Sequence, residues 1–172
     1  MSGEHDDARD AAHWDAVEEA AELLQEERYP DALVALREVL RADPRNPYAY
    51  HYLGVAFFET AQREAARDAY RAALRLSPSY LGARIGLSHT LRILGDIEGA
   101  LREAKEAQRR FPKDADAMHA AGLAHAARGD REAARRNLQG FLASSPEFEA
   151  ATEVRAVLEM LGLGDGPVEI EE

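Results

Sequence analysis

Residues 47–80 have the sequence PYAYHYLGVAFFETAQREAARDAYRAALRLSPSY, and their 34-residue length is a period that runs through most of the chain. Shifting the sequence by this period aligns four prolines, namely Pro44, Pro78, Pro112 and Pro146. It also aligns two columns of small residues, Ala32, Ala66, Ala100 and Ala134, and Ala20, Gly54, Ser88 and Gly122. A shared period of this length predicts tandem copies of one structural unit. We expect four units, at 13–46, 47–80, 81–114 and 115–148.

Each unit is predicted to contain two helices. The residues that dominate the composition are alanine, leucine, glutamate and arginine, which favour helices, and no run of alternating β-branched residues predicts a strand. Asn46-Pro47 is typical of a helix start, whereas Gly95-Asp96 and Gly129-Asp130 each combine a helix-ending glycine with an N-cap. The expected helix pairs are at about 47–60 and 63–76, 81–94 and 97–110, and 115–128 and 131–144. The small columns are expected where paired helices cross, because a large side chain there would separate the backbones.

This pattern resembles the tetratricopeptide repeat (TPR) family, whose 34-residue units carry a small residue between apolar columns and end near a proline. The second unit matches best, with Tyr50, Leu53, Gly54, Phe57, Ala66, Tyr70 and Pro78. The resemblance covers 13–148 and is weakest in the first unit. It implies an all-α fold, a right-handed α-solenoid of stacked antiparallel helix pairs.

The remaining segments are expected to flank the repeats. Residues 1–12 form an acidic N-terminal segment. Residues 149–161 are predicted to form a capping helix, because a terminal repeat has a neighbour on one side only. Its inner face is expected to carry Phe148, Val154, Leu158 and Leu161. Residues 162–172, with the sequence GLGDGPVEIEE, are expected to form a flexible acidic tail.

The composition of the chain excludes several classes of function. The chain has no cysteine, which excludes disulfides, thiol catalysis and cysteine-ligated zinc. The net charge of −11 disfavours nucleic acid, because phosphate binding needs a basic surface. No apolar stretch is long enough to insert into a membrane, and the first residues lack a basic and apolar leader pattern. Basic charge is almost all arginine, as in high-GC bacterial genomes. We therefore expect a cytoplasmic bacterial protein.

The resemblance also implies where a partner would bind. In this family the first helix of each repeat lines a concave groove, with positions 2, 5, 6, 9, 12 and 13 facing inward. Trp14 occupies one such position in the first unit. Tyrosine and arginine often dominate interface energetics, so the groove is predicted to anchor a peptide through aromatic, aliphatic and polar side chains. The candidate residues are Tyr48, His51, Tyr52, Val55, Phe58, Ile85, His89, Arg92, His119 and Leu123.

The same positions disfavour one known ligand class. Relatives that grip the carboxylate end of heat-shock chaperones use Lys and Asn at fixed groove positions. Here those positions hold Val17, Ala21, Tyr52, Gly82 and Gly86, so binding of that chaperone tail is not expected.

No catalytic constellation is predicted. The sequence lacks a phosphate-cradling glycine loop, the H-E-x-x-H and G-x-S-x-G motifs and a cysteine nucleophile. His51, His89 and His119 belong to different helices and have no carboxylate at ligand-like spacing, so we expect no metal site. No cofactor is expected either. If the groove histidines touch a ligand, its affinity should change between about pH 7.5 and 5.5.

The sequence therefore favours a non-enzymatic adaptor or scaffold that binds a protein or peptide segment in the groove. One alternative is a cytoplasmic chaperone for secreted substrates, similar to the small acidic chaperones of type III secretion. Another is a self-assembling scaffold, a homo-oligomer in which an acidic end docks on the slightly basic third unit of another copy.

Overall fold

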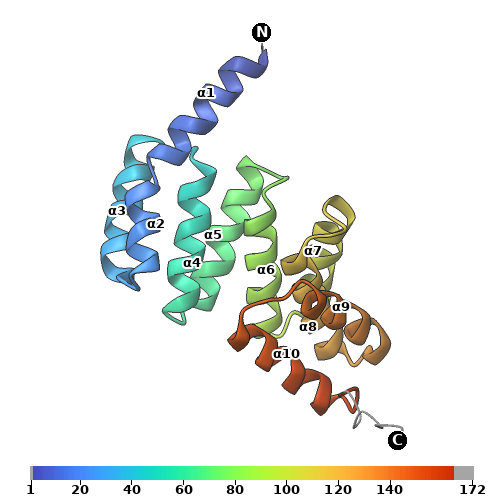
Figure 1. The fold of residues 1–172 in the computed structure, drawn as a ribbon. Coiled ribbons are helices and arrows are strands. Elements are labelled where there is room, and N and C mark those ends of the chain that lie inside the picture. The colour runs from blue at the N-terminus through green and yellow to red at the C-terminus, as the bar shows by residue number, and fades with distance from the viewer. Residues whose placement is uncertain (1, 165–172) are drawn as a thin grey trace, which may run out of the picture. The chain divides into compact units, whose positions relative to one another are not determined.

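The computed structural model describes residues 2–164, with the side chains of residues 2–6 excepted. It contains ten helices and no strand within that range, so the all-α prediction is confirmed (Figure 1). The chain divides into two compact units, residues 1–94 and residues 95–172. We call them the N-terminal and C-terminal units and describe each by itself.

The N-terminal unit consists of helices that pack as neighbours in chain order. Figure 1 shows α2 beside α3 and α4 beside α5, and each pair runs antiparallel. The helices are α1 Ser2–Asp15, α2 Glu18–Gln25, α3 Tyr29–Ala42, α4 Pro47–Glu59, α5 Arg63–Leu76 and α6 Leu81–Ile93. The core between them contains Val17, Ala20, Leu36, Ala49, Leu53 and Ala69.

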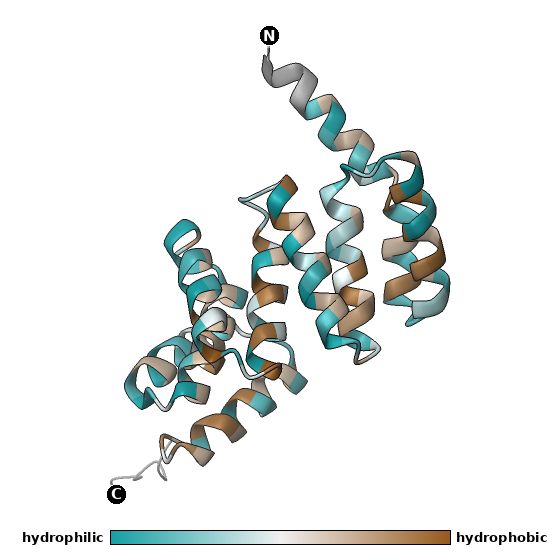
Figure 2. Cartoon of the chain, turned by 180° about the vertical axis from the view of Figure 1, so that it is seen from behind, coloured by the Kyte–Doolittle hydropathy of each residue, from teal (hydrophilic) through white to brown (hydrophobic). Residues whose placement is uncertain are grey.

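The C-terminal unit is also built from short helices. It contains α7 Ile97–Arg110, α8 Ala115–Arg128, α9 Arg131–Ala143 and α10 Phe148–Met160. The helices predicted from the period agree with α4 to α9 to within one residue at each end. Hydrophobic and hydrophilic residues are interleaved along the helices (Figure 2), as expected where one face of each helix is buried.

A tyrosine ring fixes how closely α4 and α6 approach each other. Tyr70 is on α5, and its side chain is 4 % exposed. A Cβ atom added at Gly54 would lie 2.6 Å from Tyr70 Cδ1, and one added at Gly86 would lie 2.4 Å from Tyr70 Cζ. The ring therefore fills the space that side chains at these two positions would need. In the C-terminal unit, the Leu138 side chain fills the space beside Gly122 in the same way, because a Cβ atom added at Gly122 would lie 2.5 Å from Leu138 Cδ2.

The helix ends follow the predicted chemistry with one exception. The Asn46 side chain accepts hydrogen bonds from the backbone N–H groups of Tyr48 and Ala49, and Asp96 accepts one from Gly99. Gly129 ends α8 with a φ of 88°, a conformation that favours glycine. Asp130 occupies the predicted N-cap position of α9, but its side chain does not cap the helix. Its carboxylate instead pairs with His125 Nδ1 at 3.0 Å and with the Arg128 guanidinium.

The N-terminal segment is helical across the predicted boundary at residue 12. Helix α1 continues to Asp15 and stops in a turn, where the Val17 N–H donates to the Trp14 carbonyl at 3.0 Å. Val17, expected in the groove, is fully buried. Burial of this β-branched side chain in the core accompanies the break, and α2 begins at Glu18. The place that a single helix takes in the later units is therefore divided in the first unit between the last turn of α1 and the eight-residue α2.

Helix α10 buries a narrower face than predicted. Val154 and Leu158 pack with Leu138 and Phe141 of α9. The expectation that Phe148 lies on the inner face is wrong, because its side chain is 84 % exposed at the first residue of the helix. Ala151, one turn before Val154, is buried in its place. The predicted tail from residue 165 onward lies outside the described residues.

Substitution of Gly86 tests the packing of the Tyr70 ring. Gly86→Ala is expected to lower the free energy of unfolding by about 2 kcal/mol, because the new methyl group overlaps the ring. Gly82→Ala is the comparison on the same helix, because its added Cβ would lie 3.1 Å from His51 Cε1, a milder overlap than the 2.4 Å at Gly86. This variant should change stability by less than about 1 kcal/mol. Urea unfolding measures both, and equal losses would contradict the packing described here.

The α10 contacts make a separate prediction. Leu158→Ala is expected to destabilise the C-terminal unit by about 2–4 kcal/mol, because it leaves a cavity in a packed core. Phe148→Ala removes a larger side chain that is mostly in solvent, so it should cost less than about 0.5 kcal/mol. Thermal unfolding followed by circular dichroism compares the two variants. A larger loss for Phe148→Ala would mean that the two faces of α10 are assigned the wrong way round.

Candidate partner-binding surface

One face of α4 carries four of the predicted site residues. Tyr48, His51, Tyr52 and Val55 follow one another at steps of three, one and three residues. The spacings of three and four residues among them place them on the same side of a helix. All four side chains are partly buried and keep an exposed part. Tyr48 and Tyr52 also pack against the core of the N-terminal unit. They therefore support the fold and contribute to the surface at the same time.

An aromatic cluster forms at the N-terminal end of this face. Its members are Trp14, Tyr48, His51, Tyr52 and Tyr80. The rings of Trp14 and Tyr48 meet edge to face with centroids 5.4 Å apart, and those of Tyr48 and Tyr80 do so at 5.3 Å. Trp14 also approaches Tyr52, with centroids 6.3 Å apart. Edge-to-face packing of this kind holds aromatic side chains in a fixed relative orientation.

Helix α1 joins the cluster through a hydrogen bond. The Tyr48 hydroxyl donates to Asp10 Oδ1 at 2.8 Å. Partial burial, this hydrogen bond and the negative charge of Asp10 raise the pKa of Tyr48 to about 12. Trp14 and Asp10 of α1 both reach this face, and Trp14 remains 46 % exposed. The break at Ala16–Val17 is what allows α1 to lie against α4.

His51 is held in the cluster without a hydrogen bond to its Nδ1 atom. Its ring lies 4.8 Å from Tyr80 and 5.8 Å from Tyr70, measured between centroids. A Cβ atom added at Gly82 would lie 3.1 Å from His51 Cε1, so this glycine leaves room for the ring. Burial among these rings lowers the pKa of His51 to about 4. The imidazole is therefore neutral throughout the range in which histidines usually titrate.

Phe58, at the other end of α4, is covered by a side chain of this protein. The Arg63 guanidinium carbon lies 4.3 Å above the centroid of the Phe58 ring, and Arg63 also donates a hydrogen bond to the Phe58 carbonyl. Cation–π contact with Arg63 thus occupies one face of the ring. Arg63 thus brings a positive charge to this end of α4, where Glu59 also lies.

Helix α6 supplies the next predicted residues. Ile85, His89 and Arg92 are spaced by four and three residues, so they share one side of the helix, and Ile85 and His89 are partly exposed. Arg92 Nε is buried without a hydrogen-bond partner. Burial lowers the pKa of Arg92 from its usual value, yet a guanidinium stays charged at neutral pH. Arg92 therefore has a donor available for a carboxylate or a carbonyl group.

The two predicted residues of the C-terminal unit lie in a different setting. The His119 ring stacks on Phe141 with centroids 4.4 Å apart and an interplanar angle of 15°. Leu123 packs against the core formed by α9 and α10. The structure thus brings Tyr48, His51 and Tyr52 together in the N-terminal unit, whereas His119 and Leu123 belong to the packing of the other.

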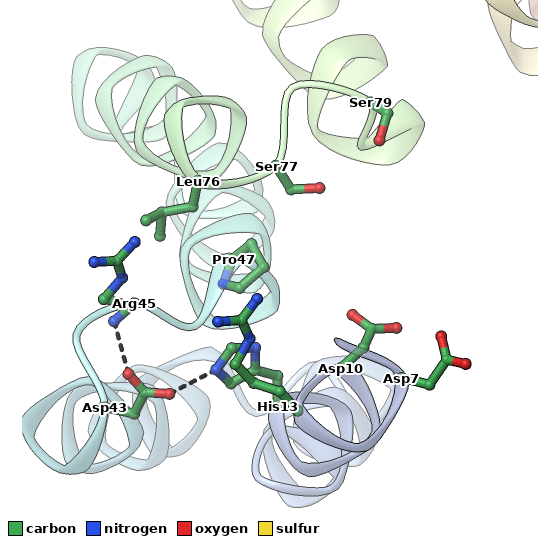
Figure 3. A pocket seen from close by; sticks show the side chains of 10 residues that line it. Asp7, Asp10, His13, Asp43, Arg45, Pro47, Leu76, Ser77 and Ser79 are labelled. Carbon is green, nitrogen blue, oxygen red and sulfur yellow. Dashed lines mark hydrogen bonds and ion pairs between the residues drawn. The ribbon is translucent and has the colours of Figure 1, made fainter. Parts of the chain in front are cut away.

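A pocket of about 590 Å³ lies beside the base of α1 (Figure 3). Within it His13 Nε2 lies 2.7 Å from Asp43 Oδ2, and Asp43 Oδ1 accepts from the Arg45 backbone N–H at 2.9 Å. That backbone bond and the His13 contact hold the pKa of Asp43 below its usual value. The described residues contain no group of three or more potential metal ligands. The pocket is lined by Asp7, Arg9, Asp10, His13, Asp43, Arg45, Pro47, Leu76, Ser77 and Ser79.

Two residues of this region were not among the predicted site residues. Tyr80 is the last residue of the second unit, a position that the family pattern does not assign to the groove. Asp10 precedes the first unit, so the period offers no equivalent position for comparison. The distance from Asp10 to Tyr48 in the sequence is 38 residues. Only the bend between α1 and α2 brings them together.

Comparison with known proteins identifies the repeat. The tetratricopeptide repeat model matches residues 17–80 and 85–130, which together are more than half of the chain. This chain belongs to the tetratricopeptide repeat family. The family membership predicted from the 34-residue period is therefore confirmed. Proteins of this family generally mediate protein–protein interactions.

Individual TPR relatives are more distant. Human superkiller complex protein 3 is 32 % identical over 74 residues, which are 43 % of this chain but only 5 % of that protein. The crystal structure of a thermophilic TPR protein from Thermus thermophilus is similar with a TM-score of 0.76 and 23 % identity, covering 88 % of this chain and 84 % of that one. PilW, a widely conserved type IV pilus biogenesis factor, has a TM-score of 0.77 and 20 % identity over 88 % of this chain and 71 % of its own. At these identities the structural likeness concerns the TPR fold alone.

The described helices also bear on membrane insertion. Within residues 2–164, none combines the length and the apolar character needed to cross a bilayer.

The low pKa of His51 predicts how the stability of the TPR chain depends on pH. Because the folded pKa is about 4 and the unfolded value is about 6.5, the unfolded state binds a proton first as the pH falls. The contribution of His51 to stability is complete above pH 6.5 and is lost as the pH falls toward 4. Between about pH 7 and 5, wild type should lose about 1–2 kcal/mol more than His51→Phe. Urea unfolding at both pH values measures this difference, and parallel losses would show that His51 titrates normally.

Proposed function

We propose that this TPR protein is a non-enzymatic adaptor that binds a segment of a partner protein on the surface formed by α4 and α6. The observation that carries the proposal is the face of α4, where Tyr48, His51 and Tyr52 present partly exposed rings in a packed cluster. Rigid aromatic side chains lose little conformational entropy on binding, which makes them effective anchors.

The guanidinium group of Arg92, on the same unit, complements these rings. Arg92 carries a buried Nε atom without a partner, and a hydrogen bond from its guanidinium to a partner carboxylate or backbone carbonyl would satisfy it. Val55 on α4 and Ile85 on α6 add partly exposed aliphatic area to the same surface. A segment lying on this surface would therefore meet apolar contacts and a charged donor, the arrangement common in peptide-binding grooves.

We propose a cytoplasmic location, on the basis of the sequence composition. His119 and Leu123 remain candidate contacts of the C-terminal unit. Chaperoning of secreted substrates and self-assembly remain alternatives. The human relative is named for a complex, superkiller complex, and that name accords with an adaptor role.

A paired substitution tests the proposed surface. Tyr52→Ala together with Arg92→Ala should reduce partner capture at least tenfold, because truncating one interface anchor typically costs more than about 1 kcal/mol. The measurement is affinity capture from extracts of the native organism, with captured proteins quantified by mass spectrometry against wild type.

The matched control is Tyr29→Ala with Arg71→Ala, which removes the same side-chain types from α3 and α5 of the same unit. These positions are outside the proposed surface, so capture should be unchanged. Circular dichroism must show that both double variants keep their helices. Equal capture by wild type and the Tyr52/Arg92 variant would contradict binding at this surface. Loss of capture by the control alone would move the site to the faces of α3 and α5.

A further inference from the structure

We infer that the aromatic cluster at the N-terminal end of α4 binds a basic side chain, a lysine or an arginine, of the partner segment. This inference rests on the proposed function and names the chemistry of the partner that the same surface selects. Three features of the N-terminal unit carry it: the exposed ring surfaces, the carboxylates of α1, and the excess of acidic residues in residues 1–46.

The rings offer π surface to a cation. Trp14, whose indole is the strongest cation–π partner among the aromatic side chains, is 46 % exposed. Tyr48, Tyr52 and Tyr80 are partly exposed around it. The same chain already shows this type of contact at Phe58, where the Arg63 guanidinium covers the ring. An incoming lysine or arginine would make the equivalent contact at the opposite end of the helix.

Carboxylates of α1 lie beside these rings. Asp10 accepts the hydrogen bond of the Tyr48 hydroxyl through Oδ1, which leaves Oδ2 for a second donor. Asp7 is three residues earlier on α1, and Figure 3 shows the two carboxylates next to each other. Both side chains are exposed. Arg9 and Arg45 line the adjoining pocket, where their two guanidinium groups are outnumbered by the three carboxylates of Asp7, Asp10 and Asp43.

The charge of the surrounding chain favours the same ligand. Residues 1–12 contain four acids and one base, and residues 13–46 contain nine acids and four bases. This excess produces a negative potential around α1 to α3, which attracts a basic segment and raises its association rate. A surface of aromatic rings with an acidic border is complementary to a positively charged side chain with an apolar stem.

The experiment uses the full chain as bait for a phage-displayed library of random linear dodecapeptides. Phages that also bind the Tyr52→Ala variant of the protein are removed, so that binding of the recovered peptides depends on the proposed surface. We expect lysine or arginine to be enriched at one position of these peptides. For a synthetic copy of a recovered peptide, replacing that residue by glutamine should weaken binding about tenfold, and the loss should shrink in high salt.

Variants of α1 identify the carboxylates. The double variant Asp7→Asn with Asp10→Asn should bind the same peptide about tenfold more weakly. The double variant Asp7→Lys with Asp10→Lys should instead select peptides enriched in aspartate or glutamate from the library. The matched control is Glu64→Gln with Asp68→Asn on α5, which changes the net charge by the same amount as the asparagine pair and should leave the affinity unchanged. Isothermal titration calorimetry measures each affinity.

The outcomes separate the inference from the proposed function. Tyr52-dependent peptides without enrichment in lysine or arginine, or with the same affinity for the Asp7/Asp10 variant, overturn the inference and leave the proposed function intact. Tyr52-dependent self-association in sedimentation would assign the surface to a second copy, and it also overturns the inference. Recovery of no Tyr52-dependent peptide contradicts the proposed function, and the inference fails with it.

Discussion

The contact between the Tyr70 ring and the two glycines beside it determines the geometry of the N-terminal unit. Gly54 and Gly86 have no side chains, so the ring can lie against both α4 and α6 at once. The separation of these two helices is set by the thickness of one aromatic ring. His51 then has its place next to Gly82, one turn before Gly86, and the aromatic cluster grows from there. The surface proposed for binding is a direct consequence of that packing.

The sequence predicted the elements that repeat and failed where an element has no counterpart. Helices α4 to α9 were placed to within one residue, because each position could be compared with equivalents 34 residues away. The break at Ala16–Val17 lies at the start of the first unit, where no preceding repeat exists. Asp130 lies at the N-cap of α9, yet its carboxylate pairs with the side chains of His125 and Arg128 and leaves the backbone N–H groups of the helix uncapped. Local sequence preference cannot show whether a carboxylate will bind the backbone or a neighbouring side chain.

The candidate site was predicted to a similar extent. Tyr48, His51 and Tyr52 were expected on one surface, and they meet there because helical spacing alone puts them on one side of α4. The sequence did not reveal that Arg63 covers Phe58, nor that Tyr80 joins the cluster. Both contacts depend on the directions in which side chains leave their helices. Phe148 was misplaced for a related reason, since an apolar residue at a helix start can point away from the core.

The position of Trp14 has one more consequence. It is the only tryptophan of the chain, and its indole lies half exposed against Tyr48 and Tyr52. The ultraviolet emission of the protein above the tyrosine band therefore originates from a single place, the junction of α1 and α4. The fold thus contains its own optical reporter for the arrangement of that junction, without any label.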